Sequence, residues 1–296
     1  MTNSFYPARK SAWGSLLPRR VVVERQLRKL PLYLVLLVFA VIFAFPFYYM
    51  FVLATWPRQL MFTSPPRLWF GPGVVHNLEA LFESVPFHVN MFNSIGIAVL
   101  AVATQLFFCT MGGFAFAKYE FKGQNVLFAM IIALISVPPF LNIIPFFQMM
   151  SAFGWINTWY PLIVPMMASP FGIFLMSQFL KNEVPSQLMD SARIDGLSEF
   201  GIFLRVAAPL AKPAMSILGI VTFVGTWNNF LGALIFLPDL EKTTIPVALA
   251  RLFLSARTDY GAVMAGTALS LVPVLVLYVV FARRIIGDLQ AGALKG

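Results

Sequence analysis

The feature that most constrains this chain is a series of apolar segments long enough to cross a lipid bilayer. A membrane-spanning helix needs about 20 consecutive apolar residues, and the chain offers such segments at 32–54, 92–117, 125–150, 158–180, 213–237 and 262–282. Charged residues make up only 11% of the sequence, whereas a soluble domain carries about 25%. A water-soluble fold is therefore excluded, and we predict an all-α, polytopic membrane protein with six transmembrane helices.

Positive charges fall almost entirely on one side of this predicted topology. With the N-terminus inside, the inner segments carry sixteen Lys and Arg against seven Asp and Glu, and the outer segments carry five against five. Because cytoplasmic loops are enriched in Lys and Arg, we predict that both termini are cytoplasmic. This topology and the attraction to anionic lipid account for the net charge of +9, so nucleic-acid binding is not expected.

The N-terminal residues form a basic stretch before the first apolar segment. That segment is too long for the core of a cleaved signal peptide. We therefore assign 1–31 as a basic cytoplasmic segment and 32–296 as one transmembrane domain. His76 and His88 share a single polar stretch without metal-ligand spacing, so no metal site is expected. Cys109 lies in an apolar run and is expected to be a buried structural thiol.

Few polar side chains interrupt the predicted spans. Because an amide exposed to lipid is unfavourable, such residues should face the interior of the bundle. Two interpretations are open: they line a pathway for a hydroxyl-rich solute, or they form interhelical hydrogen bonds worth about 0.6 kcal/mol each. The candidate pathway residues are Gln105, Asn142, Gln148, Thr226, Asn228 and Asn229. No charged residue lies in mid-span, which argues against an ion-coupled pump.

Prolines concentrate in the third and fourth predicted spans. They occur at Pro138, Pro139, Pro145, Pro161, Pro165 and Pro170. Each removes a backbone donor and disturbs the helix around it, and such breaks persist at membrane depth only where protein or a wet cavity satisfies the freed carbonyls. We predict bent or interrupted helices near a pathway, with a plain packing kink as the alternative.

A polar segment at 181–212 separates the fourth and fifth spans. Pro185 can open a helix, on which Val184, Leu188 and Ala192 would share one face. Gly196 permits a tight turn. A second helix would then place Phe200, Phe203, Leu204 and Ala207 on one face, with Pro209 and Pro213 ending it and starting the next span. We predict a helix–turn–helix at the inner surface. A helix resting on lipid headgroups is the alternative.

The polar segment resembles a known sequence motif. Asp190-Ser191-Ala192, two residues, Asp195-Gly196, a spacer, then Pro209-Leu210 and Pro213 is similar to the EAA loop of permease subunits of ABC importers, the socket for the ATPase in that family. Two positions depart from the family pattern. Aspartate replaces glutamate at 190, which shortens its reach by one methylene, and serine replaces alanine at 191.

The resemblance extends over roughly residues 30–296. The motifs that carry it are Asn93-Ser94, Lys118-Tyr119-Glu120-Phe121-Lys122-Gly123, Pro145, Leu162 to Pro165, Phe174-Leu175, Gln178-Phe179, Trp227-Asn228-Asn229-Phe230, Thr244-Ile245-Pro246-Val247, Met264-Ala265-Gly266, Pro273 and Gly287 to Gly296. Together they are similar to carbohydrate-uptake permeases, in particular to the smaller membrane subunit of maltose-type transporters.

This resemblance implies a type I ABC importer permease fold in a bacterial or archaeal cytoplasmic (inner) membrane. The expected partners are a second related permease, two ATPase subunits and an extracytoplasmic solute-binding protein that delivers a sugar. The implied ATPase-coupling residues are Asp190, Ser191, Ala192, Asp195, Gly196, Leu197, Phe200 and Pro209. The tail 287–296 is a second expected ATPase contact, with a solvated tail as the alternative. The outer stretches 55–91 and 238–261 should meet the binding protein, unless their aromatic residues are interfacial anchors.

The sequence contains no phosphate-binding loop and no nucleophile–base pair. We therefore expect no cofactor and no catalytic residue in this chain, with ATP and Mg²⁺ held by the partner ATPases. A stand-alone secondary sugar transporter is the first alternative, and it would be expected to carry a titratable group within the bundle. A membrane enzyme is the second, and clustered acidic, histidine or serine side chains at the membrane surface, which would indicate one, are absent from the sequence.

Overall fold

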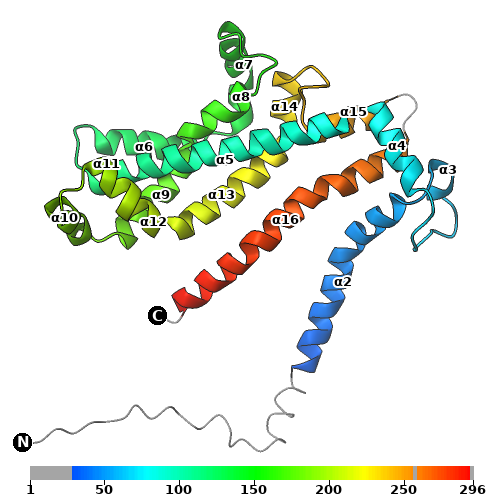
Figure 1. Cartoon of the computed structure of the whole chain (residues 1–296), viewed down its shortest axis with the longest axis horizontal. Coiled ribbons are helices and arrows are strands. Elements are labelled where there is room, and N and C mark those ends of the chain that lie inside the picture. The colour runs from blue at the N-terminus through cyan, green and yellow to red at the C-terminus, as the bar shows by residue number, and fades with distance from the viewer. Residues whose placement is uncertain (1–28, 256–258, 294–296) are drawn as a thin grey trace, which may run out of the picture.

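The computed structural model describes residues 29–255 and 259–293, and every regular element within these ranges is helical. The α-helices are α2 (Leu30–Leu53), α3 (Arg58–Met61), α4 (Val74–Ser84), α5 (Phe87–Lys118), α6 (Gln124–Ile135), α7 (Ile143–Ala152), α8 (Tyr160–Ile163), α9 (Pro170–Glu183), α10 (Ser186–Ile194), α11 (Glu199–Ile202), α12 (Ala208–Leu210), α13 (Lys212–Trp227), α14 (Phe230–Phe236), α15 (Ile245–Phe253) and α16 (Tyr260–Ala293). Two 3₁₀ turns, η2 (Pro139–Asn142) and η3 (Val164–Ala168), and a π-helical turn, η4 (Phe203–Ala207), complete the set. The all-α prediction is confirmed for the described residues (Figure 1).

Helix α5 is the centre of the packed bundle. It contacts α9, η3 and α13 along its length, and α15 near its start. Helix α16 packs against α4, α15 and α2 at the other end of the molecule. Figure 1 shows α2 and α16 extending away from the bundle from this shared end. Most of the predicted segment 1–31 lies outside the described residues, as do positions 294–296 of the predicted tail, whose residues 287–293 continue α16.

The first span, α2, is apolar on every side. None of its most apolar window is buried within this chain, and only its last turns pack on α16 and α4. A helix that is hydrophobic all round requires apolar surroundings. The surroundings of α2 are therefore lipid or another membrane protein, which matches its prediction as a transmembrane span.

Close helix packing in the bundle depends on two glycines. A Cβ at Gly113 of α5 would lie 2.6 Å from the Cβ of Met176 and 2.7 Å from the backbone nitrogen of Ser177, so the two backbones nearly touch. A Cβ at Gly172 would lie 2.8 Å from the sulfur of Cys109. Small residues at such crossings allow the close approach that stabilises membrane helix pairs. Cys109 is fully buried at this crossing, as predicted for a structural thiol.

The six predicted spans are only partly reproduced as continuous helices. Among the described residues, four helices are long and apolar enough to cross a membrane, or five if the bent pair Glu199–Leu210 and Lys212–Trp227 counts as one. The predicted span 125–150 is two short helices, α6 and α7, separated around η2. Consecutive prolines at 138 and 139 remove two backbone donors there. The predicted interruption of the third and fourth spans is thus confirmed, since the fourth is likewise divided into α8, η3 and α9.

The fifth predicted span is also divided. Helix α13 ends at Trp227, and after Asn228 and Asn229 the chain enters the short helix α14. The side-chain oxygen of Asn229 accepts a hydrogen bond of 3.0 Å from the Gly232 backbone nitrogen. This bond is an N-cap, which satisfies a donor that the start of α14 would otherwise leave unpaired. The two asparagines therefore mark a helix break.

Candidate functional site

The polar segment at 181–212 folds into two short helical pieces joined by a glycine turn. Helix α10 ends at Ile194, and Gly196 adopts a φ of +82°. Its backbone nitrogen donates to the Arg193 carbonyl at 3.0 Å, and the Leu197 nitrogen donates to the Ala192 carbonyl at 3.0 Å. Glycine enters this left-handed region at little cost, whereas other residues are strained there. The turn at Gly196 thus satisfies the last carbonyls of α10.

The face by which α10 packs differs from the predicted one. Met189 and Ala192 are buried together with Val184, but Leu188 is 44% exposed. The predicted register is wrong because Val184 and Pro185 have extended backbones and α10 begins only at Ser186. Val184 therefore lies outside the helical periodicity that carries Met189 and Ala192 inward.

The second helical piece is longer and less regular than predicted. Phe203 and Ala207 are buried, whereas Phe200 and Leu204 are exposed. The π-helical turn at 203–207 shifts the inward face partway along the helix. Pro209 does not end this helix as predicted, because helical structure continues to Leu210 before the chain bends by 78° into α13.

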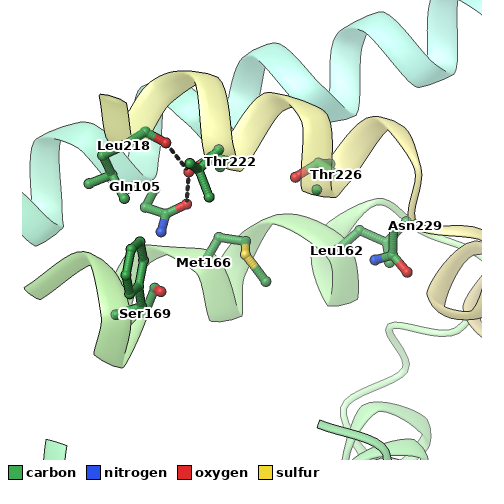
Figure 2. Close-up of a pocket in the computed structure, with 11 residues that line it drawn as sticks. Gln105, Leu162, Met166, Ser169, Leu218, Thr222, Thr226 and Asn229 are labelled. Atoms are coloured by element: carbon green, nitrogen blue, oxygen red, sulfur yellow. Dashed lines mark hydrogen bonds between the residues drawn. The ribbon is translucent and has the colours of Figure 1, made fainter. Parts of the chain in front are cut away.

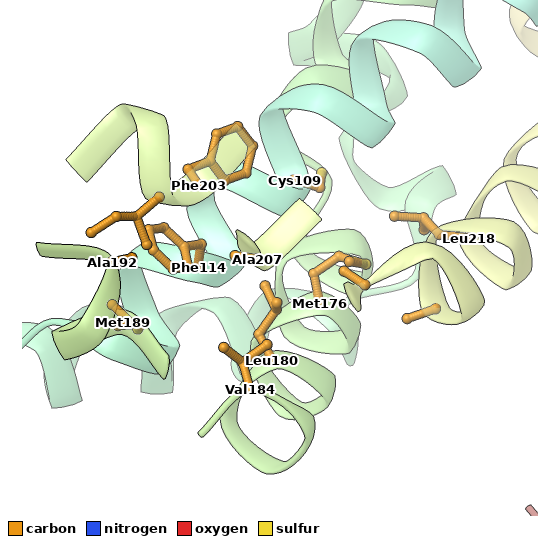
Figure 3. Close-up of a cluster of buried hydrophobic side chains, with 13 residues drawn as sticks. Cys109, Phe114, Met176, Leu180, Val184, Met189, Ala192, Phe203, Ala207 and Leu218 are labelled. Atoms are coloured by element: carbon orange, nitrogen blue, oxygen red, sulfur yellow. The ribbon is translucent and has the colours of Figure 1, made fainter. Parts of the chain in front are cut away.

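A buried apolar cluster holds this segment against the bundle. Figure 3 shows side chains from α10 and η4 meeting side chains from α5, α9 and α13. The cluster comprises Cys109, Phe114, Met176, Leu180, Val184, Met189, Ala192, Ile202, Phe203, Ala207, Ala211, Ala214 and Leu218. Leu197 is partly buried against it. Because the cluster is continuous, α10 packs as part of the bundle and not as an isolated surface helix.

Among the predicted coupling residues, the acidic ones are exposed and one of them is paired. Asp190 accepts a hydrogen bond of 2.8 Å from Nη1 of Arg193, and Nε of Arg193 donates at 2.8 Å to Glu199. Asp195 is exposed, and the Ser191 hydroxyl donates to the Gln187 carbonyl of its own helix at 3.0 Å. An exposed ion pair stabilises by only about 0–1 kcal/mol, so Asp190 can exchange Arg193 for another cation.

The carboxylate of Glu199 also accepts a hydrogen bond from the hydroxyl of Tyr119, just beyond α5. Burial and this bond raise the pKa of Tyr119 to about 12. The hydrogen bonds from Arg193 and Tyr119 lower the pKa of Glu199. A lowered carboxylate pKa stabilises the fold at neutral pH, and that contribution is lost only as the pH falls through the lowered value. Both groups therefore keep their bonding state around neutral pH.

A cavity of about 290 Å³ with a mixed lining of apolar and polar side chains lies between α5, α13 and the segment around η3 (Figure 2). Three predicted pathway residues line it: Gln105, Thr226 and Asn229. The Thr222 hydroxyl lies 2.6 Å from Oε1 of Gln105 and 2.7 Å from the Leu218 carbonyl. With its oxygen engaged, Gln105 directs its amide nitrogen away from Thr222 into the cavity, as Figure 2 shows.

The remaining predicted pathway residues differ in whether they line a cavity. Asn142 and Asn229 both line a second cavity of about 220 Å³. Gln148 and Asn228 line neither of these two cavities and are exposed within this chain. The amide nitrogen of Asn228 donates to the Val224 carbonyl of its own helix at 3.0 Å. Asn142, Gln148 and Asn228 lie at or near the breaks of the third and fifth predicted spans and are exposed on the surface of this chain.

At the opposite end of α5, buried amides hold the segment that follows α14. Asn90 donates to the Leu240 carbonyl at 2.6 Å, and Asn93 donates to the Glu241 carbonyl at 2.8 Å. The Ser94 hydroxyl accepts from the Ile245 nitrogen at 2.8 Å. Sequence reasoning singled out Asn93 and Ser94 but missed this role, since the partners lie about 150 positions away in the sequence.

Among the described residues, four helices are long and apolar enough to cross a bilayer, which is typical of a polytopic membrane protein. Residues 109–287 match the family described as binding-protein-dependent transport system inner membrane component. The match covers more than half of the chain, which therefore belongs to this family.

Two relatives and one solved structure are similar over most of the chain. It is 31% identical over 260 residues to the arabinooligosaccharides transport system permease protein AraQ of Halalkalibacterium halodurans, covering 87% of this chain and 93% of that protein. It is 29% identical over 264 residues to the lactose transport system permease protein LacG of Rhizobium radiobacter, covering 89% and 96%. A chain of a bacterial ABC transporter involved in the import of alginate shares the fold, with a TM-score of 0.77 and 21% identity over 95% of this chain and 99% of that chain.

Proposed function

We propose that this chain is the membrane-spanning permease subunit of an ATP-driven, binding-protein-dependent sugar importer. The observation that carries the proposal is the two-helix segment α10–α11, which lies on the bundle beside the end of α5 and carries the Asp190–Gly196 motif. A sugar is the proposed substrate class because the relatives AraQ and LacG are named for arabinooligosaccharides and lactose.

The segment α10–α12 is the proposed docking site for an ATPase subunit, in a helix–turn–helix arrangement. Asp190, Asp195 and Phe200 are exposed there. Together with Leu188, Ile194, Leu204 and Leu210 they form a surface that mixes carboxylates with exposed apolar side chains. Such a surface suits a protein partner, because aromatic and aliphatic groups supply contact area and the charges supply specificity. ATP and Mg²⁺ would be held by the ATPases.

The proposed topology has six crossings with both termini in the cytoplasm. In this topology, α6 and α7 together form the third crossing, and α13 and α14 together form the fifth. Lipid and a second, related permease surround both pairs. The concentration of Lys and Arg near the C-terminal end of α5, the end of α9 and the start of α13 supports the cytoplasmic placement of that end.

The cavity at Gln105 is proposed as part of the translocation pathway, of which this subunit forms one half. A sugar presents many hydroxyl groups, and amides and hydroxyls can donate to and accept from them. Gln105, Thr226 and Asn229 offer such groups in the larger cavity, and Asn142 joins Asn229 in the smaller one. Gln148 and Asn228 could meet the pathway only from the surface that faces the partner permease.

The function is tested by reconstitution into vesicles. The chain alone should produce no sugar flux, and uptake should appear only when the second permease, the ATPase subunits, the binding protein and ATP are all supplied. This result separates the proposal from a stand-alone secondary transporter, which needs no partner. Flux through the chain alone, without ATP, would contradict the proposal directly.

Replacing Gln105 by leucine tests the pathway. The variant keeps a similar volume but removes the amide nitrogen that points into the cavity, and we expect a drop in uptake of about tenfold, because an unmet sugar hydroxyl costs about 1–3 kcal/mol. Uptake and complex yield are measured together in the reconstituted importer. The control is Thr104→Val, since the Thr104 hydroxyl donates to the Leu100 carbonyl of its own helix at 2.7 Å. Equal uptake by both variants would remove Gln105 from the pathway.

A further inference from the structure

The two residues at the cytoplasmic end of α5 each bind the polar segment, but at different places. The ammonium group of Lys118 donates to the carbonyl of Val184 and, at 3.4 Å, to the carbonyl of Lys181. The Lys181 carbonyl belongs to the last turn of α9, where the helix leaves acceptors unpaired and its dipole is negative, and the Val184 carbonyl belongs to the residue directly after the helix. Lys118 therefore fixes the chain directly before α10 begins.

The neighbouring residue fixes the chain directly after α10. The Tyr119 hydroxyl donates to Glu199, the first residue of α11, and the Tyr119 ring packs edge-on against Phe114 at 5.4 Å. Glu199 is bonded in turn to Arg193 of α10 at 2.8 Å. Lys118, the last residue of α5, and Tyr119, the residue directly after it, thus hold both flanks of α10.

We infer that Lys118 and Tyr119 form a clamp that couples displacement of α10 to α5. The inference rests on the proposed function, in which an ATPase moves this segment. The inference gives a role to Lys118 and Tyr119, which are not part of the proposed docking surface.

The covalent connections of the segment explain why a lateral clamp matters. Before α10 the backbone is extended at Val184 and Pro185, and after α12 the helix direction changes by 78° at Ala211. Neither connection is a continuous helix, so each can flex without moving the span beyond it. The clamp links α10 to α5 through side-chain hydrogen bonds, independently of these two covalent connections. It acts on a single unbroken helix of 32 residues.

Helix α5 also lines the cavity at Gln105. Gln105 lies 13 positions before Lys118 in the same helix, a distance of about 20 Å at 1.5 Å per residue. α5 packs on both α9 and α13. A movement that enters at the clamp therefore arrives at the cavity through one rigid element. Lys118 and Tyr119 are positioning residues, since they touch neither the cavity nor a nucleotide.

The test uses the complete importer reconstituted in vesicles, with sugar uptake and ATP hydrolysis measured on the same preparation. Lys118→Met combined with Tyr119→Phe removes both hydrogen bonds but keeps most of the apolar packing. We expect complex yield and ATP hydrolysis close to wild type, and uptake per ATP reduced at least about fivefold, the lower end of typical coupling between sites. The single variant Lys118→Arg retains hydrogen-bond donors at position 118 and keeps the native Tyr119. It should retain most of the wild-type uptake per ATP hydrolysed.

Lys122→Met is the matched control, because it removes an exposed lysine from the turn that follows α5. It should leave the ratio unchanged. The clamp is overturned if the double variant keeps the wild-type ratio, and equally if uptake falls only in proportion to complex yield, which is the mark of a folding role. Failure of the proposed function is a separate result, since the wild-type complex would then show no ATP-driven uptake.

Discussion

Replacing Gly196 by proline is expected to abolish ATP-driven sugar uptake while the chain still inserts into the membrane. Gly196 has a φ of +82°, and its nitrogen donates to the Arg193 carbonyl. Proline fixes φ near −65° and lacks that donor. It also disfavours the backbone conformation of Asp195, whose φ and ψ are −70° and 1°. The turn between α10 and α11 would open, and the proposed docking surface would be lost.

A graded series at Gly196 separates backbone conformation from side-chain bulk. A Cβ at position 196 would meet no atom within 4 Å, so a substitution there acts through the backbone strain of a positive φ and not through a steric clash. Asparagine tolerates the left-handed region and should retain uptake, whereas alanine pays about 1–2 kcal/mol there and should reduce it. Surface labelling of the chain in membranes checks insertion, and ATP-driven uptake checks function. Wild-type uptake by Gly196→Pro would defeat the proposed role of the turn.

Replacing Gly113 by alanine is expected to destabilise the bundle more than any other single methyl group that could be added to α5. The new Cβ would lie 2.6 Å from the Cβ of Met176 and 2.8 Å from its carbonyl carbon. The second of these atoms is backbone, which cannot rotate away. Overpacking of this kind costs about 1–3 kcal/mol, and here α5 and α9 must also separate. Thermal stability and yield of the purified protein in detergent should both fall.

The neighbouring glycine is the matched control. A Cβ at Gly112 would lie 3.5 Å from the Ile173 side chain, an ordinary contact. Alanine favours a helix over glycine by about 1 kcal/mol, so Gly112→Ala should be neutral or slightly stabilising. Equal behaviour of the two variants would show that the close approach of α5 and α9 does not limit stability.

The correct and incorrect predictions share a physical cause. Apolar length identified α2, α5 and α16 correctly, because crossing a bilayer depends on a local property of about 20 residues. The turn at Gly196 was also predicted correctly, because it depends on the conformational freedom of a single glycine. The shared face of α10 was predicted wrongly at Val184, since a helix register depends on where the helix starts and the extended Val184 and Pro185 delay that start.

Other features of the site could not be derived from the sequence. The bond from Tyr119 to Glu199 spans 80 positions, and that from Thr222 to Gln105 spans 117. No local pattern encodes such pairings, because they arise only when α5 is packed between α9 and α13. The same packing divides the predicted pathway residues. It places Gln105 and Asn229 at a cavity and leaves Gln148 exposed.

From the sequence alone it follows that this chain is helical, that it is a membrane protein, and that a polar segment with a glycine turn interrupts its apolar spans. Each of these properties follows from residues adjacent in the chain, through hydropathy, proline geometry or the conformational freedom of glycine. Which side chains meet across helices depends on the tertiary packing of distant segments. The clamp from Lys118 and Tyr119, and the cavity at Gln105, exist because distant segments pack together at backbone-to-backbone contact.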